Sequence, residues 1–195
     1  MSCIIINEMR KEKKGEIRII GGKWKGKKIY FDLSNDLRPT PDRANETLFN
    51  WLGQDLSEMY CLDLFSGTGA LGLEAFSRGA KKVTFVEKNK EYLQKIKKNY
   101  LTMSEKTNCD FFCSECLDWV KNNSTQTKYD LIFIDPPYSY FDDKTLNGII
   151  RTTLKLSPPG GIIVCEHPKE EKIILDVKNR VRSYKDKFIT FCWQN

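Results

Sequence analysis

The chain has 195 residues, 40% of them hydrophobic, which suffices for one large domain or for one domain with a small appendage. No apolar run approaches the roughly 18 residues that a membrane-spanning helix needs, and the run from Cys3 to Ile6 is too short for a signal-peptide core. The formal net charge of +6 is concentrated in residues 10–28, which carry nine basic and two acidic side chains. A compact protein located in the cytoplasm is therefore expected.

The basic block is predicted to form a β-hairpin. Short β-type runs at 18–20 and 28–31 flank a stretch that holds three glycines, as a turn would. Positive charge of this density suits a surface that contacts nucleic-acid phosphates, although a solvated lysine-rich segment would carry the same charge. A helix over 41–52 is predicted next, with Thr40 as its N-cap and Pro41 at its first position.

From Tyr60 onward, short β-type runs alternate with helical patterns, which is typical of a parallel sheet covered on both faces. The predicted strands are 60–64, 82–86, 109–113, 129–134 and 161–166, and the predicted helices are 70–78, 89–103, 116–122 and 142–156. The chain then changes pattern and ends in two or three successive strands, at 172–177, 181–185 and 187–193. The sequence thus predicts an α/β sheet that is closed by an antiparallel hairpin.

The seven cysteines are scattered along the chain and contain one C-x-x-C pair, Cys113 and Cys116. This pair has no second pair to complete a metal site, and His167 is the one histidine of the chain. Reduced structural thiols and no bound metal are therefore expected.

A glycine loop follows the first predicted core strand, in the stretch DLFSGTGALGLEA at residues 63–75. Gly67, Gly69 and Gly72 have the G-x-G-x-x-G spacing of dinucleotide-binding loops. Asp63 argues against NAD, because a carboxylate cannot help to bind a pyrophosphate but could face the amino group of an amino-acid-bearing cofactor. The loop therefore predicts a cofactor that contains adenosine and an amino acid.

Two acidic residues follow the next two strands. Glu87 ends the second core strand, where a carboxylate can accept both ribose hydroxyls of an adenosine cofactor. Glu115 lies just past the third strand and could accept a hydrogen bond from the adenine amino group, or it could simply begin the next helix.

The stretch Asp135-Pro136-Pro137-Tyr138 directly follows the apolar strand at 129–134. Two consecutive prolines fix the chain direction and leave a carboxylate, carbonyls and an aromatic ring at the edge of the sheet. The Asp135 carboxylate and the Pro136 carbonyl can each accept one N–H of an exocyclic amine, while Tyr138 stacks on the base. These four residues are therefore predicted to position a base amine for attack on an electrophile.

On these residues the chain resembles class I S-adenosylmethionine-dependent methyltransferases, and specifically the RsmD family of bacterial small-subunit ribosomal RNA guanine-N2 methyltransferases. The resemblance covers nearly the whole chain after about residue 16. Besides the glycine loop and D-P-P-Y, it rests on RIIGGKWKG at 18–26, LRPT at 37–40, DR at 42–43 and ETLFNWL at 46–52.

The resemblance implies a Rossmann-like, seven-stranded, mostly parallel sheet with one antiparallel strand, helices on both faces, and an N-terminal β-hairpin and helix. It implies direct methyl transfer from S-adenosyl-L-methionine, with S-adenosyl-L-homocysteine as product, to N2 of a guanosine in 16S ribosomal RNA. It also implies a basic extension at 1–15, an RNA-binding hairpin and helix at 16–55 near the catalytic face, and the methyltransferase domain at 56–195. The expected partner is ribosomal RNA, within the small subunit or an assembly intermediate, and the protein is expected to be a monomer.

The implied site residues form three groups. The catalytic group is Asp135, Pro136, Pro137 and Tyr138, and the cofactor group is Asp63, Phe65, Ser66, Gly67, Thr68, Gly69, Glu87, Lys88, Glu115, Cys116 and Asp135. The RNA-binding group is Arg18, Lys23, Trp24, Lys25, Lys27, Arg38, Thr40 and Arg43.

Two alternatives stay open. DNA adenine-N6 methyltransferases also use D-P-P-Y, but they normally carry a sizeable target-recognition insert, for which this chain has no free segment. A non-catalytic RNA-binding factor for ribosome assembly could use the same scaffold, although Asp63, Glu87 and the whole D-P-P-Y motif argue against it.

Overall fold

The computed structural model describes residues 14–33, 42–105, 108–123, 127–137, 140, 143–170, 173, 177–184 and 187–193, with the backbone alone at 42, 43, 143 and 144. Its main sheet has seven strands in the order β5-β4-β3-β6-β7-β9-β8. They are β3 (Tyr60–Asp63), β4 (Lys82–Glu87), β5 (Cys109–Cys113), β6 (Leu131–Ile134), β7 (Ile162–Pro168), β8 (Lys178–Tyr184) and β9 (Lys187–Trp193). Only β9 runs against the other described strands of the sheet, which confirms the predicted mostly parallel sheet with one reversed strand.

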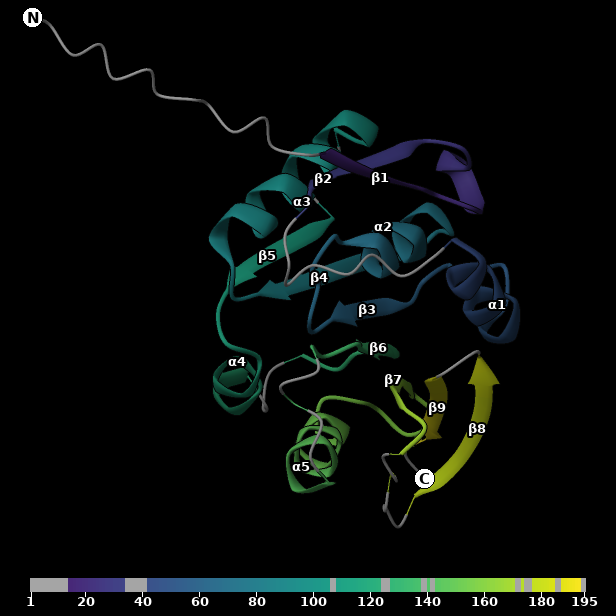
Figure 1. Ribbon diagram of the computed structural model, residues 1–195, viewed down its shortest axis with the longest axis vertical. Helices are drawn as coiled ribbons and strands as arrows, with labels where there is room; N and C mark the ends of the chain where they lie inside the picture. Colours follow the sequence, from purple (N-terminus) through teal and green to yellow (C-terminus); the bar gives the residue numbers. More distant parts are fainter. Residues whose placement is uncertain are drawn as a thin grey trace, which may run out of the picture.

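Helices cover both faces of the sheet, as Figure 1 shows. On one face lie α1 (Asp42–Leu52), α2 (Ala70–Ser77) and α3 (Lys90–Met103), and on the other lie α4 (Cys116–Asn123) and α5 (Asp143–Leu154). Because successive strand residues point to opposite faces, β3 divides its side chains between two cores, with Cys61 in one and Leu62 in the other. Among the described helices, none is both long and apolar enough to cross a membrane.

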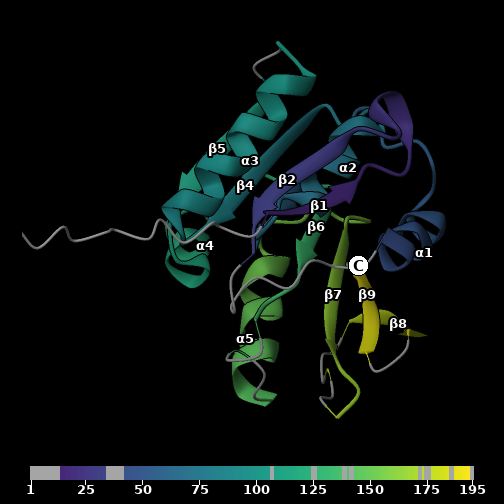
Figure 2. The same cartoon turned by 45° about the horizontal axis from the view of Figure 1, so that its top comes forward.

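A separate two-stranded hairpin packs on the outside of α2 and α3 (Figure 2). It consists of β1 (Lys14–Arg18), β2 (Lys28–Asp32) and, at its tip, the 3-10 helix η1 (Gly22–Trp24). Asn99 of α3 fixes β2 by accepting a hydrogen bond from the Tyr30 amide (3.2 Å) and donating one to the Tyr30 carbonyl (2.8 Å). The predicted hairpin is confirmed. Its first strand nevertheless ends at Arg18, and the Ile20 amide donates to a carboxylate of α2.

The C-terminal part differs from the prediction in its boundaries. β8 begins at Lys178, three residues before the predicted strand at 181–185, and β9 has the predicted bounds. Of the strand predicted at 172–177, residues 173 and 177 are not in a strand and the others lie outside the described residues. In the described part of the chain, two strands therefore follow β7.

Candidate functional site

The glycine loop joins β3 to α2 at the carboxyl edge of the parallel strands. Gly67 and Gly69 have φ angles of 49° and 78°, in the left-handed region that favours glycine. Gly72 lies inside α2, where a Cβ atom would overlap the Phe85 ring of β4. The first two glycines therefore permit the turn, while the third permits close packing of the helix on the sheet.

Asp63 ends β3 and lies beneath this loop. Its side chain is 2% exposed, and its Oδ2 atom accepts a hydrogen bond from the Gly72 amide at 3.0 Å. Burial raises the pKa of Asp63 to about 7, the charge of Glu87 acts in the same direction, and the Gly72 hydrogen bond opposes both. In this structure Asp63 ties β3 to α2, and its contact with a cofactor amino group stays a prediction.

Glu87 ends β4 and holds the loop from the neighbouring strand. Its Oε2 atom accepts the Gly67 amide at 2.9 Å, and its Oε1 atom accepts the Asn89 amide at 2.8 Å. Each carboxylate oxygen has two lone pairs, so both oxygens can accept one further hydrogen bond. Glu87 is therefore oriented by the backbone and can still bind a vicinal diol such as a ribose.

Glu115 precedes α4 and is the centre of a small polar cluster. The hydroxyl of Tyr140 donates to both of its carboxylate oxygens, at 2.8 and 2.7 Å, and the Lys88 ammonium lies 3.7 Å from Oε1. The Tyr140 ring also meets Phe65 of the glycine loop edge-on, with centroids 5.2 Å apart. The pKa of Tyr140 is raised mainly by burial and, to a smaller extent, by the hydrogen bond to Glu115.

Tyr140 was not among the predicted site residues. It connects the loop after β6 to two elements of the predicted cofactor site, the glycine loop and the residue after β5. The available signal was a second tyrosine, two residues beyond the D-P-P-Y motif. Its contacts join parts of the chain that are distant in sequence, so spacing alone could not reveal them.

Asp135 and Pro136 lie at the same edge of the sheet as the glycine loop. Asp63 at the end of β3 pairs with Phe133 of the adjacent strand β6. Asp135 comes two residues after Phe133 and therefore lies just beyond Asp63 at this edge. Asp135 is half-buried, Pro136 is buried and Pro137 is exposed, while Tyr138 lies outside the described residues. The structure therefore brings Asp135 and Pro136 to the edge of the sheet that carries the predicted cofactor loop.

The other predicted cofactor residues support the loop or the start of α4. The buried Ser66 hydroxyl lies 2.9 Å from the Asp63 carbonyl oxygen, to which it donates, and the Thr68 hydroxyl accepts the Ala70 amide at 3.3 Å. The Cys116 amide donates to Glu115 at 3.1 Å, and burial raises the pKa of its thiol to about 12. Cys116 is thus no activated nucleophile.

The predicted RNA-binding residues fall into three groups. Arg18, Lys23, Lys25 and Lys27 are exposed on the hairpin. Trp24 is buried, and its ring packs on Phe76 of α2 with centroids 4.9 Å apart, so the prediction that it contacts RNA is corrected. Arg38, Thr40 and the side chain of Arg43 lie outside the described residues.

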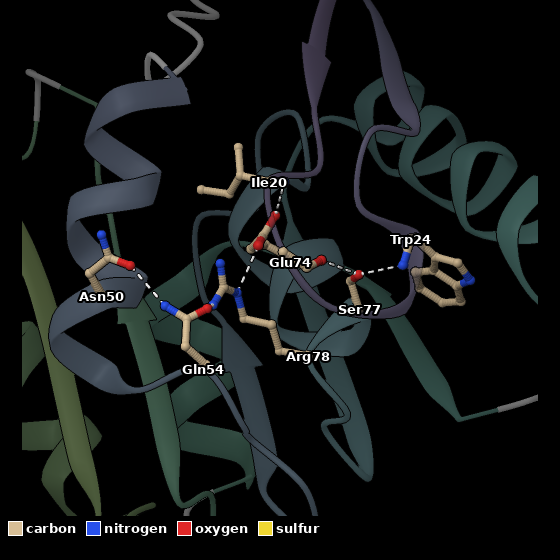
Figure 3. Close-up of polar contacts among 8 residues, drawn as sticks. Ile20, Trp24, Asn50, Gln54, Glu74, Ser77 and Arg78 are labelled. Carbon is tan, nitrogen blue, oxygen red and sulfur yellow. Dashed lines mark hydrogen bonds and ion pairs between the residues drawn. The ribbon is translucent and has the colours of Figure 1, made fainter.

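A buried polar network fastens the hairpin to the C-terminal end of α2 (Figure 3). Glu74 and Arg78 form an ion pair of 2.7 Å with both side chains 3% exposed, and Glu74 also accepts the Ile20 amide at 2.8 Å. Ser77 donates to the Gly21 carbonyl at 2.6 Å and accepts the Trp24 amide at 2.9 Å.

Arg78 extends this network to α1. Its guanidinium donates to Gln54, just after α1, and lies 4.8 Å from the centroid of the Phe49 ring. Arg78 therefore links the α1 region to Glu74, which in turn binds the hairpin.

The tip of the hairpin lies away from the glycine loop, and the expectation that the basic hairpin binds RNA near the catalytic face stays a prediction. Gly69 caps the first turn of α2, whereas η1 packs on Ser77 at its last turn, about 12 Å further along the helix. The close approach requires glycine, since a Cβ atom on Gly22, where φ is 70°, would overlap the Ser77 carbonyl.

Comparison with known proteins agrees with this architecture. A family model described as "Conserved hypothetical protein 95" matches residues 17–191. Proteins named Ribosomal RNA small subunit methyltransferase D are 44% identical over 128 residues in Haemophilus influenzae and 38% identical over 152 residues in Escherichia coli K12. The chain belongs to the RsmD family. The two alignments cover 65% and 78% of this chain, and 66% and 72% of those relatives.

Solved structures place this RsmD-family chain in the class I methyltransferase fold. The structure of yhhF from Escherichia coli superposes with a TM-score of 0.78 at 32% identity and covers 92% of this chain and 98% of that one. A Thermus thermophilus 16S rRNA N2 G1207 methyltransferase, RsmC, in complex with AdoMet and guanosine, superposes with a TM-score of 0.74. It is 17% identical and covers 94% of this chain and 50% of that one, so it shows the fold alone.

The residues present fit S-adenosylmethionine, the cofactor that is expected from the sequence. The left-handed glycine turn, the oriented Glu87 carboxylate and the Glu115 carboxylate lie at the carboxyl edge, where ligands bind in open α/β sheets. Their chemistry suits a ligand with a ribose diol and an amino-substituted base.

Proposed function

We propose that this RsmD-family protein transfers the methyl group of S-adenosylmethionine to the exocyclic N2 amine of a guanosine in 16S ribosomal RNA. The observation that carries the proposal is the position of Asp135 and Pro136, one strand away from the glycine loop and at the same edge of the sheet. The names of relatives at 38% and 44% identity support small-subunit ribosomal RNA as the substrate.

In this proposal the cofactor supplies a methyl group bonded to a sulfonium, which is a strong electrophile. Asp135 and the Pro136 carbonyl accept the N–H groups of the guanine amine and point its nitrogen lone pair at the methyl carbon. A nitrogen–carbon bond forms as the sulfur–carbon bond breaks, and the amine proton passes to Asp135 or to water. Because the chain mainly positions the two reactants, its contribution is the alignment of those reactants, which can remove up to about 7–11 kcal/mol from a barrier in favourable cases.

Glu87 and Glu115 would hold the adenosine part of the cofactor, and Tyr140 would couple that part to the loop that carries Asp135. This coupling is supported by the two Tyr140–Glu115 contacts and by the packing of Tyr140 on Phe65. Residues 16–55 would contribute to RNA binding, with the substrate presented as the small subunit or an assembly intermediate and the protein acting as a monomer.

The deciding experiment is methyl transfer from labelled S-adenosylmethionine to small ribosomal subunits isolated from a strain that lacks the enzyme. The proposal predicts label in 16S RNA, at N2 of one guanosine when the modified base is mapped. Label in DNA adenine or in protein would instead assign the alternative substrates. Binding of RNA without binding of S-adenosylmethionine in calorimetry would favour the non-catalytic assembly factor.

A further inference from the structure

The outermost strand of the sheet, β8, carries a row of basic side chains that the proposed site does not use. Lys178, Arg180 and Arg182 are all exposed, and they alternate along β8 so that they share one face of the strand. Among the described residues, no carboxylate forms an ion pair with any of the three. We call these three residues the β8 basic row.

The β8 basic row faces the side of the sheet that carries α1. Arg180 pairs with Phe191 of β9, and Arg182 pairs with Ile189, so each basic side chain shares its face with a residue that packs in the core under α1. The Arg182 guanidinium also lies 5.9 Å from the ring centroid of Trp51 in α1, whose side chain is 39% exposed. The row is therefore continuous with an exposed aromatic side chain of α1.

The strand register places this row level with the predicted catalytic residue. Ile134 of β6 pairs with Cys165 of β7, so the next residues, Asp135 and Glu166, are level with each other. On β9, Ile189 pairs both with Glu166 of β7 and with Arg182 of β8. Arg182 is thus three strand spacings from Asp135, roughly 14 Å across the hydrogen-bond ladder. The exposed lysines of the hairpin tip, in contrast, lie at the far end of α2.

Among the described residues of this face, the carboxylate nearest to the row in the strand register is already paired. Glu166 shares the face of Arg182, and its carboxylate is paired with the Lys187 ammonium. The β8 basic row therefore presents three positive charges and a neighbouring indole ring to solvent. Phosphates attract such charges, and unpaired bases stack on such rings.

We infer that the β8 basic row, together with Trp51, binds the RNA backbone that flanks the target guanosine. The inference rests on the proposed function, since it takes RNA as the substrate. Phosphates follow one another along the strand, so a chain that delivers its base to Asp135 can cross β8 within a few nucleotides. Trp51 offers a surface for one flanking base.

The test compares the wild-type chain with a variant that carries Lys178→Gln, Arg180→Gln and Arg182→Gln. The substrates are small subunits lacking the modification and labelled S-adenosylmethionine, and binding to a 16S RNA fragment is titrated at several salt concentrations. Each lost phosphate contact lowers the slope of log affinity against log salt by about 0.7, so the slope should fall by about 2. At about 0.15 M salt, the same slope change corresponds to a rise of about 50-fold in KM for RNA, while kcat at saturating RNA and affinity for S-adenosylmethionine stay unchanged.

Two control proteins sharpen the result. Lys97→Gln with Lys98→Gln removes two exposed charges from α3, far from β8 in the strand order, and should leave KM near the wild-type value. Lys178→Arg with Arg180→Lys and Arg182→Lys keeps all three charges and should restore most of the salt dependence.

A triple-Gln variant with wild-type KM and salt slope would overturn the inference. If that variant instead only self-associates, the charges merely protect an exposed strand edge, which also overturns it. If the wild-type chain does not methylate RNA, the proposed function itself is wrong. That result differs from unchanged RNA binding by the triple-Gln variant, which would contradict only the role of the β8 basic row.

Discussion

The two ends of α2 carry out different tasks with different kinds of contacts. At the N-terminal end, Glu87 accepts backbone amides and keeps lone pairs that a ligand can use. At the C-terminal end, Glu74 and Arg78 are buried together, and their contacts are made within the protein, to Ile20 and Gln54. The first arrangement leaves acceptors for binding, whereas the second fastens separate segments of the chain to one another.

This comparison teaches that burial alone does not identify a functional carboxylate. Burial raises the pKa of both Asp63, which ends β3, and Glu74, which lies in α2. What differs is the element to which each one is bonded, α2 in the case of Asp63 and the hairpin in the case of Glu74. Substitutions at the catalytic edge should therefore change turnover or ligand affinity, and substitutions at the far end should change stability.

The largest effect is expected for Asp135→Ala at the catalytic edge. Loss of the carboxylate should lower kcat by about 10²–10⁴-fold, because the amine is no longer oriented and loses its proton acceptor. Affinity for S-adenosylmethionine, measured by calorimetry, should change little. Methylation at the wild-type rate by this variant would remove Asp135 from the mechanism.

Arg78→Met should destabilise the protein by about 3–5 kcal/mol, because it leaves the Glu74 carboxylate buried without its ion-pair partner. Urea unfolding followed by circular dichroism measures the change. The double variant with Glu74→Met should recover part of the loss, since two apolar side chains leave no uncompensated charge. Equal stability of Arg78→Met and wild type would show that the network does not hold the far end of α2.

Stability should also depend on pH through Asp63. Its folded pKa of about 7 lies above the ordinary value of 3.8, so the folded state holds the proton more tightly than the unfolded state. The contribution of Asp63 to stability is greatest below pH 3.8 and is lost as pH rises toward 7, by up to about 4 kcal/mol.

Asp63→Asn is the matched variant, because the amide can still accept the Gly72 hydrogen bond without ionising. The free energy of unfolding of this variant, relative to wild type, should rise between pH 4 and pH 7 in the absence of cofactor. A difference that stays constant over this range would show that Asp63 is ionised throughout.

The smallest effect is expected for Glu87→Gln. This substitution keeps the shape of the side chain but removes a charged acceptor for the ribose diol, so affinity for S-adenosylmethionine should fall by about 1.5–3 kcal/mol. Isothermal calorimetry with wild type and variant measures it. The prediction fails if the affinity is unchanged while the fold is intact.

Much of the catalytic edge could be predicted from the sequence because its motifs are short and follow strand ends. Asp63 lies near the end of one predicted strand, and Glu87 and Asp135 each directly follow another. Since parallel strands align their carboxyl ends, the alternation of strands and helices was enough to predict that these residues share one edge. The positions of Tyr140 and Trp24 could not be predicted in this way. Tyr140 is placed by its contact with Glu115 and Trp24 by its contact with Phe76, and neither contact is encoded in the residue spacing.

The sequence by itself determined the α/β class, the glycine turn and the residues at the ends of the strands, because each depends on local periodicity and on backbone preferences near glycine and proline. The tertiary structure alone decided where the hairpin lies, since Ser77 and Glu74 hold its tip at the far end of α2. It also decided that Arg182 is level with Asp135, because that level follows from strand pairing between segments almost fifty residues apart. Long-range hydrogen bonds and buried charges set these positions, and neither leaves a periodic signal in the chain.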